Sequence, residues 1–314
     1  MCCKEREWSM SVKRKDVIDA YRFILGREPE NEEVIRHHMQ LPDIEALRQA
    51  MLNSEEFRRT NKLLEFGEKW VAAEIFENYR IWLNLADKYV SYGCLINDYE
   101  PHETRFVREH LKPGQTFVDI GANIGWFTML AASIVGTDGK VISIEPRGDI
   151  YRYLVRSVCE NHLDNIVEYH RCALSDKRGY TDIMWAANTD NPGGTHIGTP
   201  SSEGFNVERV LTLTLDEVMN ERTCDFIKID VEGAEPLVFA GAAQLLERCS
   251  PVILSELFPE QLHTISNSSA REYIALMRKY GYKCYLLEDE VKEELRDFPE
   301  GYHKELCSVV FVVN

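Results

Sequence analysis

The chain has 314 residues, of which 44% are hydrophobic and 28% are charged, and its formal net charge is −16. This length suits one large α/β domain with an attachment, or two domains, and it is ample for a buried core. The acidic balance argues against nucleic acid as a partner, because affinity for a phosphate backbone depends on clustered Lys and Arg.

The first part of the chain, residues 1–62, is predicted to form a small helical module. The apolar residues of "KRKDVIDAYRFILG" fall on one helical face, and Gly26 followed by Pro29 ends that helix. Further short helices are expected in "DIEALRQAML" and in "NSEEF", where Asn53 is the N-cap. Because the module can bury little surface alone, we expect it to pack on the rest of the chain or on a partner.

A connecting segment, residues 63–98, is predicted to contain a helix over about 62–84 and short strands. From residue 99 to 314 short β-rich runs alternate with helical ones, which predicts a doubly wound, mostly parallel sheet with helices on both faces. The last two strands lack room for a crossover helix between them, so an antiparallel terminal strand is expected. Strands are predicted at 116–121, 140–146, 166–173, 225–233, 251–257, 283–288 and 307–313, with helices near 124–135, 149–162, 234–248 and 269–281.

The stretch 186–208, "AANTDNPGGTHIGTPSSEGFNVE", is rich in Asn, Gly, Pro, Ser and Thr and is predicted to be a loop. Long loops inside compact domains often cover or bind ligands. Nine scattered cysteines without metal-type spacing indicate reduced thiols, and no apolar run is long enough to cross a membrane. The N-terminus also lacks the apolar middle of a secretory signal, so we expect a cytoplasmic protein without a membrane span.

The segment "FVDIGANIGWFT" places two glycines between a predicted strand and a predicted helix. In doubly wound sheets, ligands bind beyond the carboxyl ends of the strands. Gly121 permits a tight turn, and Gly125 opens the helix. Asn123 occupies the place of the second glycine in the dinucleotide fingerprint, the residue that makes room for a pyrophosphate, so NAD and FAD are less favoured.

The next predicted strand, "KVISIEP", ends in Glu145. An acid at the end of the second strand can accept hydrogen bonds from both ribose hydroxyls of a nucleoside. The chain thus offers an adenosine-type site without a phosphate cradle. S-adenosyl-L-methionine, a nucleoside with a charged tail that contains no phosphate, fits this combination.

Four separated motifs carry a resemblance to a known family: "YEPHETRFVREHLKPGQTFVDIGANIGWFT", "VISIEP", "CALSD" and "FIKIDVEGAE". Together they resemble the FkbM family of S-adenosylmethionine-dependent methyltransferases over about residues 99–290. The resemblance implies a class I methyltransferase (Rossmann-like) fold and an activity associated mainly with O-methylation of sugars, polysaccharides and natural products. The N-terminal "DAYRFILGREPE" and "LNSEEF" resemble a small helical module found beside glycan-processing enzymes.

The resemblance also implies which residues hold the cofactor. By position, the glycine turn would line the methionine part, Glu145 the ribose, and the end of the third strand the adenine. Glu103, in "YEPHET", would close over the cofactor, and the loop "NPGGTHI" would lie nearby. The expected cofactor-binding residues are Glu103, Asp119, Gly121, Asn123, Gly125, Glu145, Cys172, Ala173 and Asp176.

The strand "FIKIDVEG" is the best candidate for the catalytic residues. Lys228 and Asp230 are two positions apart, so in a strand both point to one side, and Glu232 continues the series beyond the strand end. Buried charges need partners or a ligand. Lys228 could equally form a buried ion pair with Asp230, and Glu232 could instead cap the following helix. His196, in the glycine-rich loop, is a candidate general base or an exposed loop histidine.

Asp230 and Glu256 are expected at neighbouring strand ends, where two carboxylates could hold Mg²⁺. A metal is nevertheless the less favoured interpretation, because Glu256 could simply bind a sugar hydroxyl. We expect an enzyme that O-methylates a hydroxyl of a sugar, polysaccharide or glycosylated natural product. The alternatives are N- or carboxyl-methylation of a small molecule or peptide, or a binding module without catalysis. The N-terminal helices could mediate a homodimer or recruit a glycosyltransferase.

Overall fold

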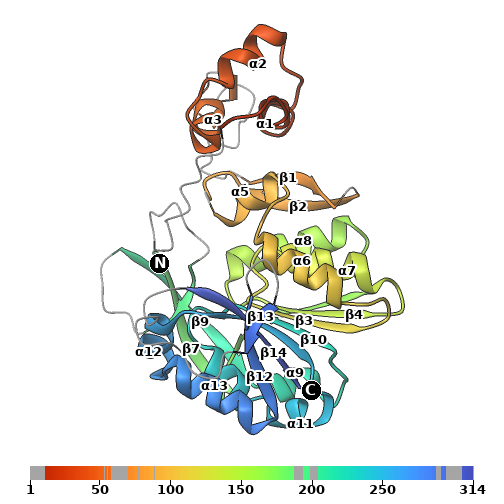
Figure 1. Ribbon diagram of the computed structural model, residues 1–314, viewed down its shortest axis with the longest axis vertical. Coiled ribbons are helices and arrows are strands. Elements are labelled where there is room, and N and C mark those ends of the chain that lie inside the picture. The colour runs from red at the N-terminus through yellow and green to blue at the C-terminus, as the bar shows by residue number, and fades with distance from the viewer. Residues whose placement is uncertain are drawn as a thin grey trace.

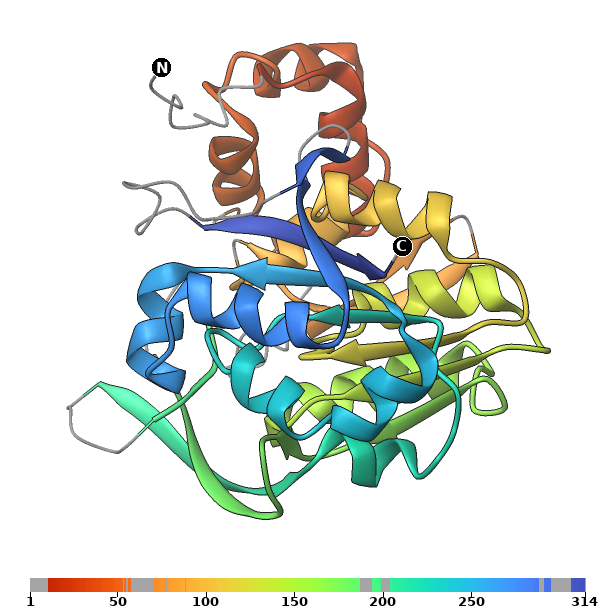
Figure 2. The ribbon, with the colours of Figure 1, turned by 60° about the horizontal axis from the view of Figure 1, so that its bottom comes forward.

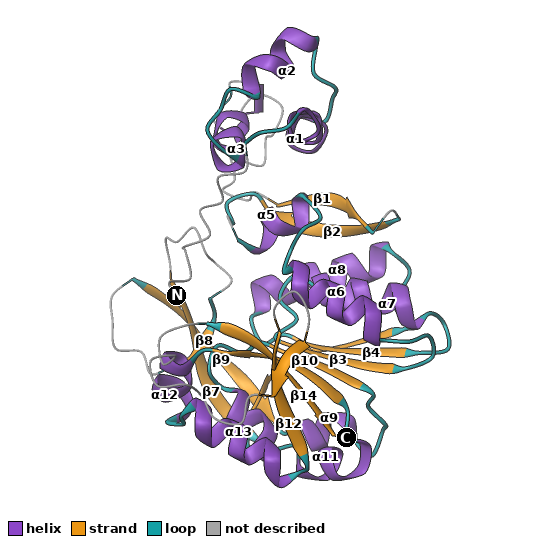
Figure 3. Ribbon diagram, in the orientation of Figure 1, coloured by secondary structure: helices purple, strands orange, loops and turns teal. Residues whose placement is uncertain are grey.

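The computed structural model of the chain describes residues 11–52, 54, 56–57, 70–76, 78–87, 89–186, 194–198, 204–287, 291–294 and 306–313. An eight-stranded sheet lies at its centre, and the helical module lies at one end of the molecule (Figure 1). Helices flank the sheet on both faces (Figure 3).

The order of the strands in the central sheet is β13-β12-β14-β11-β10-β3-β4-β5. The five strands β3, β4, β5, β10 and β11 run parallel, and β14 runs antiparallel to both of its neighbours, as expected for the terminal strand. The chain builds outward from β3 to β5 and then returns to β10 on the other side of β3, so the strand order reverses there. This is a doubly wound arrangement, as the resemblance led us to expect. The strands are β3 Thr116–Ile120, β4 Lys140–Ile144, β5 Val167–His170, β10 Phe226–Ile229, β11 Val252–Leu257, β12 Tyr282–Leu287, β13 Val291–Glu294 and β14 Cys307–Val313.

Alternate residues of the central strands enter two different hydrophobic clusters. Phe117 and Phe226 pack toward α6, α7 and α8, whereas Val118 and Ile227 pack toward the helices from α9 to α13. This alternation is the two-residue period of a strand that is covered on both faces. The helices are α6 Pro101–His110, α7 Trp126–Val135, α8 Gly148–Glu160, α9 Leu215–Met219, α10 Glu235–Ala240, α11 Ala243–Cys249, α12 Pro259–Ser266 and α13 Ala270–Lys279.

A β-hairpin of β1 (Trp70–Ile75) and β2 (Tyr79–Asn84) covers the outer side of α8. The helix expected over 62–84 is therefore wrong for residues 70–84. The burial of β2 alternates, with Ile81 and Leu83 inside, which is the period of a strand and not of a helix. On the outer edge of β2 the backbone amide of Trp82 donates to Ser157 Oγ of α8 at 3.1 Å. A short helix, α5 Val90–Leu95, follows the hairpin.

A second sheet, of order β6-β9-β7-β8, lies beyond the ends of the parallel strands. It is built on a long antiparallel pair that extends away from the body of the molecule (Figure 2). The loop expected over 186–208 is wrong for His196–Ile197, which form β8, and for its last residues, because β9 begins at Phe205. Residues 187–193 and 199–203 lie outside the described part. The strands are β6 Ala173–Leu174, β7 Gly179–Ala186, β8 His196–Ile197 and β9 Phe205–Leu213.

The helical module has a hydrophobic cluster of its own, to which Leu85 of the following segment also belongs. Gly26, with φ +69°, ends the first helical stretch as expected, and the expected N-cap Asn53 lies outside the described residues. Within the described part of the chain, no helix is long and apolar enough to cross a membrane. The elements of the module are α1 Arg14–Ala20, the π-helical segment η1 Tyr21–Leu25, α2 Glu32–His38 and α3 Ile44–Leu52.

Candidate active site

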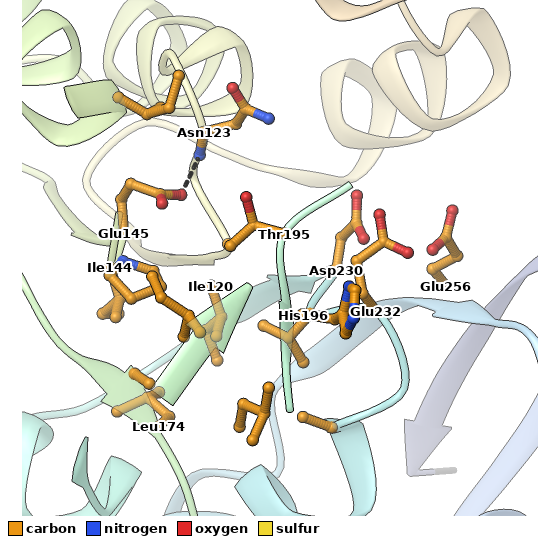
Figure 4. A pocket seen from close by; sticks show the side chains of 18 of the residues that line it. Ile120, Asn123, Ile144, Glu145, Leu174, Thr195, His196, Asp230, Glu232 and Glu256 are labelled. Carbon is orange, nitrogen blue, oxygen red and sulfur yellow. Dashed lines mark hydrogen bonds between the residues drawn. The ribbon is translucent and has the colours of Figure 1, made fainter. Parts of the chain in front are cut away.

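A cavity of about 350 Å³ opens at the carboxyl ends of β3, β4, β10 and β11. This edge includes the point where the strand order reverses, which is where doubly wound sheets bind ligands. Figure 4 shows Asn123 and Glu145 at one end of the cavity and Asp230, Glu232 and Glu256 at the other. Its size falls within the lower part of the range for small-molecule sites.

The turn after β3 requires glycine because two other segments of the chain pass close to it, the end of β10 and helix α8. Gly121 has φ +80°, and a Cβ at this position would lie 1.9 Å from the backbone oxygen of Asp230. Gly125 has φ +99°, and its Cβ would lie 2.5 Å from Leu154 of α8. Both positions therefore favour glycine for conformational and steric reasons. Gly121 lines the cavity, whereas Gly125 precedes α7 and packs against Leu154 without lining it.

Two backbone amides hold the carboxylate of Glu145. The N–H of Asn123 donates to Oε2 and the N–H of Arg147 donates to Oε1, each at 2.9 Å. Asn123 adopts the left-handed conformation, with φ +51°, that the turn requires. Burial raises the pKa of Glu145 to about 7, although the two amides favour its ionised form. The side chain is therefore fixed in direction and poised near neutral pH between its two charge states.

The wall beside Glu145 is largely apolar. Ile144, Ile150 and Leu174 line it together with the predicted adenine neighbours Cys172 and Ala173. Burial raises the pKa of the Cys172 thiol to about 12, so this group stays neutral and contributes a small apolar surface. A flat aromatic base would bury its faces well against such a wall.

Strand β8 crosses the cavity on the side of the second sheet. Thr195 and His196 line the cavity, and the guanidinium of Arg147 lies near both Thr195 Oγ1 (3.5 Å) and the ring of Trp185 (4.1 Å to its centre). These contacts connect β8 to the segment that holds Glu145. His196 therefore lines the same cavity as Asp230 and Glu232 (Figure 4).

Lys228 contacts the acidic end from beneath without lining this cavity, and its side chain is almost completely buried. Its ammonium is 3.1 Å from Asp230 Oδ2 and 3.8 Å from Glu100 Oε2, and it lies over the ring of Phe127. Burial alone would lower its pKa, but the surrounding carboxylates raise the pKa above its usual value. Lys228 thus carries a positive charge beside Asp230, in the ion pair that was considered as the alternative to a catalytic role.

Three further carboxyl groups lie near Asp230, and the ammonium of Lys228 is the positive charge that acts on all of them. Burial raises the pKa of Glu100 to about 7 against the opposing effect of Lys228. Burial and the charge of Asp230 likewise raise the pKa of Glu232 to about 7, while Gln261 Nε2 donates to Glu232 at 2.6 Å. Burial raises the pKa of Glu256 well above its usual range. This end can therefore take up or release a proton near neutral pH.

Besides Gly125, three more residues expected to bind the cofactor lie outside this cavity. Asp119 is buried beneath it and accepts a hydrogen bond from Thr128 Oγ1 at 2.6 Å. Glu103 accepts a hydrogen bond from Ser308 Oγ and lines a neighbouring cavity instead. Asp176 accepts a hydrogen bond from Ser175 Oγ and is not among the residues that line either cavity. Asp119 therefore acts on the cavity indirectly, because its hydrogen bond with Thr128 holds β3 and α7 together.

A metal site was the less favoured interpretation of Asp230 and Glu256. Among the described residues, no group of three or more His, Cys, Asp or Glu side chains converges in a way that could hold a metal ion. At the acidic end the ammonium of Lys228 contacts Asp230 directly, in the position where a cation would balance the carboxylates. The side chains present therefore do not fit a bound Mg²⁺.

Sequence reasoning missed Glu100, Tyr99 and Gln261, which also line the cavity. Glu100 has φ +42° and directly precedes Pro101, the first residue of α6. The motif "YEPHET" contains two acids, Glu100 and Glu103, and we expected Glu103 to contact the cofactor. The proline after Glu100 marks the start of a helix, and this position could have indicated Glu100 instead. Gln261 comes from α12, which was not expected, and no local pattern places that helix beside β10.

The comparison with protein families gives one match. The family model described as the methyltransferase FkbM domain matches residues 119–284, which is more than half of the chain. A comparison with curated proteins found no match.

Two solved structures illustrate the likeness to known proteins. The methyltransferase FkbM from Methylobacillus flagellatus is 15% identical, with 71% of this chain and 55% of that chain covered and a TM-score of 0.41. This chain therefore spans little more than half of that protein. An O-methyltransferase from Bacillus cereus in complex with SAH is 17% identical, with 69% and 83% covered and a TM-score of 0.39.

Proposed function

Because the chain belongs to the FkbM methyltransferase family, we propose that it transfers the methyl group of S-adenosyl-L-methionine to a hydroxyl of a sugar, a polysaccharide or a glycosylated natural product. The observation that carries this proposal is the division of one cavity into two ends. A fixed carboxylate beside an apolar wall lies at one end, and a group of carboxylates around Lys228 lies at the other.

The Glu145 end fits the nucleoside of this cofactor. Both oxygens of Glu145 already accept one backbone N–H, and each keeps a lone pair that can accept a ribose hydroxyl. The apolar wall formed by Ile150, Cys172 and Leu174 suits the adenine. Asn123 and Gly121 also line the cavity, and we assign them the contacts with the methionine part.

The bound cofactor supplies an activated methyl group on a sulfonium, and the protein has to align an acceptor oxygen with it. Holding the two reactants in attack geometry can contribute about 7–11 kcal/mol to lowering the barrier. The close contact of Gly121 with the backbone oxygen of Asp230 fixes the distance between the cofactor turn and the acidic end. In this proposal the backbone at the strand ends is therefore the main feature that aligns the acceptor oxygen with the methyl group.

An acceptor hydroxyl must also lose its proton, and we assign this role to Asp230. Lys228 pairs with the Asp230 carboxylate, and Glu232 and His196 line the same cavity (Figure 4). Glu232, with a pKa of about 7, can take the proton onward toward the open side of the cavity. A positioned base contributes roughly 10²–10⁴-fold to the rate.

The Asp230→Asn variant tests this assignment. Asparagine keeps the shape but accepts no proton, so turnover should fall by roughly 10²–10⁴-fold while the affinity for S-adenosylhomocysteine stays within about twofold. Transfer of a labelled methyl group to extracts of the native host, followed by mass spectrometry, measures turnover and identifies the acceptor. Full turnover in this variant would remove Asp230 as the base and would favour methylation of a nitrogen, which needs no strong base.

A further inference from the structure

A second, larger cavity adjoins the candidate active site. Its volume is about 1080 Å³, and it shares Tyr99, Glu100, Asp230 and Glu256 with the first cavity. It extends from the acidic end toward the N-terminal module, whose residues 42–45 form part of its wall. Figure 2 shows the helices of the module above the C-terminal strands of the sheet. A ligand in this space could reach the point where Asp230 meets the first cavity.

The module is anchored to the rest of the chain at this wall. Arg48 of α3 is buried, and its Nη2 donates to the backbone oxygen of Leu85 at 2.6 Å. The same guanidinium lies 3.2 Å from Glu45. Because Leu85 also belongs to the hydrophobic cluster of the module, the wall is a packed part of the molecule.

Acidic side chains line this cavity from several directions. Asp43 and Glu45 come from the module, and Asp98, Glu100 and Glu103 come from the segment that leads into α6. Among the described residues that line the cavity, Lys228 is the basic one, and it lies at the inner end against Asp230. Although Arg48 pairs with Glu45, the charge of the described lining near the module is net negative, so a cationic group there would meet opposite charge and an anionic group would be repelled.

The cavity also offers a polar group without a partner. Tyr92 lines the cavity, and its buried hydroxyl has no hydrogen-bond partner among the described residues. A buried hydroxyl of this kind costs free energy unless a ligand or water satisfies it. Tyr92 lies on α5, and it also lines a smaller cavity beside Ile44 and Arg48 of the module.

We propose that this second cavity is the acceptor site and that Asp43 and Glu45 of the module bind an ammonium group of an amino sugar, remote from the hydroxyl that is methylated. The inference rests on the proposed methyl transfer. It assigns the N-terminal module a direct part in choosing the acceptor, and it excludes phosphorylated and carboxylated sugars from the site.

The test compares three oligosaccharides of similar length by calorimetry on the full chain saturated with S-adenosylhomocysteine. Chitosan oligosaccharide is cationic, its N-acetylated form is neutral, and oligogalacturonate is anionic. We expect the cationic probe to bind about tenfold more tightly than the neutral one, and the anionic probe not to bind. Equal binding of the cationic and neutral probes, or no binding of any of the three, would overturn the inference.

The double variant Asp43→Asn, Glu45→Gln tests whether these two residues cause the preference for the cationic probe. Asparagine can still cap α3, where Asp43 Oδ1 now accepts the N–H of Ala46, so the fold should persist. The affinity for chitosan oligosaccharide should fall about tenfold, and that for the neutral probe should not change. Glu33→Gln, on the exposed side of α2, is the matched control. An unchanged preference in the double variant would refute the role of the module, whereas failure of the wild-type chain to bind S-adenosylhomocysteine would instead refute the proposed function.

Discussion

At one end of the active-site cavity the backbone holds a single carboxylate, whereas at the other end several carboxylates surround one lysine. Glu145 takes its direction from two amides of the glycine turn and the following strand end. Asp230 takes its direction from Lys228, a side chain. The first arrangement depends on the course of the main chain, and the second depends on a balance of charges. The two ends should therefore respond differently to substitution and to pH.

The largest effect is expected from Gly121→Ala, because this residue connects the two ends. A Cβ would overlap the backbone oxygen of Asp230, and the φ of +80° adds strain, so the turn and the end of β10 must separate. We expect a loss of about 3 kcal/mol or more in unfolding free energy, measured by urea denaturation. Gly26→Ala, at a similar φ but with no atom within 4 Å of the Cβ, should cost only about 1 kcal/mol. Equal losses in the two variants would contradict the close contact.

The next effect concerns the charged end alone. Lys228→Met removes the ammonium from among buried carboxylates, which should cost about 3–5 kcal/mol at pH 8. At pH 5.5 the loss should be smaller, because Glu100, with a pKa of about 7, is then protonated and needs no counter-charge. Denaturation at the two pH values measures this difference. Lys177→Met, at an exposed lysine 3.9 Å from Asp176, is the control and should change little. A loss independent of pH would show that Lys228 acts by packing.

The smallest expected effect is on cofactor affinity at the Glu145 end of the cavity, where two backbone amides bind the carboxylate. Ribose hydroxyls donate to an ionised carboxylate, so cofactor binding should favour the charged form of Glu145 and lower its pKa from about 7. The affinity for S-adenosylhomocysteine should then rise between pH 6 and pH 8, by up to about tenfold, and level off above. Glu145→Gln should bind about tenfold or more weakly, without this rise. Calorimetry at several pH values measures the affinity of the wild-type chain and of the variant. If the affinity of the variant also rises with pH, a group other than Glu145 causes the rise.

Glu145 should also affect the stability of the protein without cofactor. Its pKa is higher in the folded chain than the usual 4.5, so the folded state binds more protons between about pH 4.5 and 7. Its contribution to stability is therefore fully present below pH 4.5 and is lost as the pH rises toward 7. Cofactor binding opposes this loss by pairing the ionised form.

Much of the sheet could be predicted because its strands are buried on both faces and separated by helices with clear apolar stripes. Glu145 could be predicted for the same reason, since it directly follows such a strand. The β1–β2 hairpin could not, because "WVAAEIF" and "YRIWLN" are short and their apolar residues fit a helix as well as a strand. Glu100 and Gln261 reach the cavity through the packing of α6 and α12, which local sequence does not specify.

The contact between Gly121 and the backbone oxygen of Asp230 has an evolutionary consequence. In the proposed reaction, the spacing between the methyl donor and its acceptor is set by these main-chain atoms, which mutation of neighbouring side chains leaves in place. Descendants of such a protein can exchange the residues that recognise the acceptor, and so acquire new specificities, while the reacting atoms remain in line.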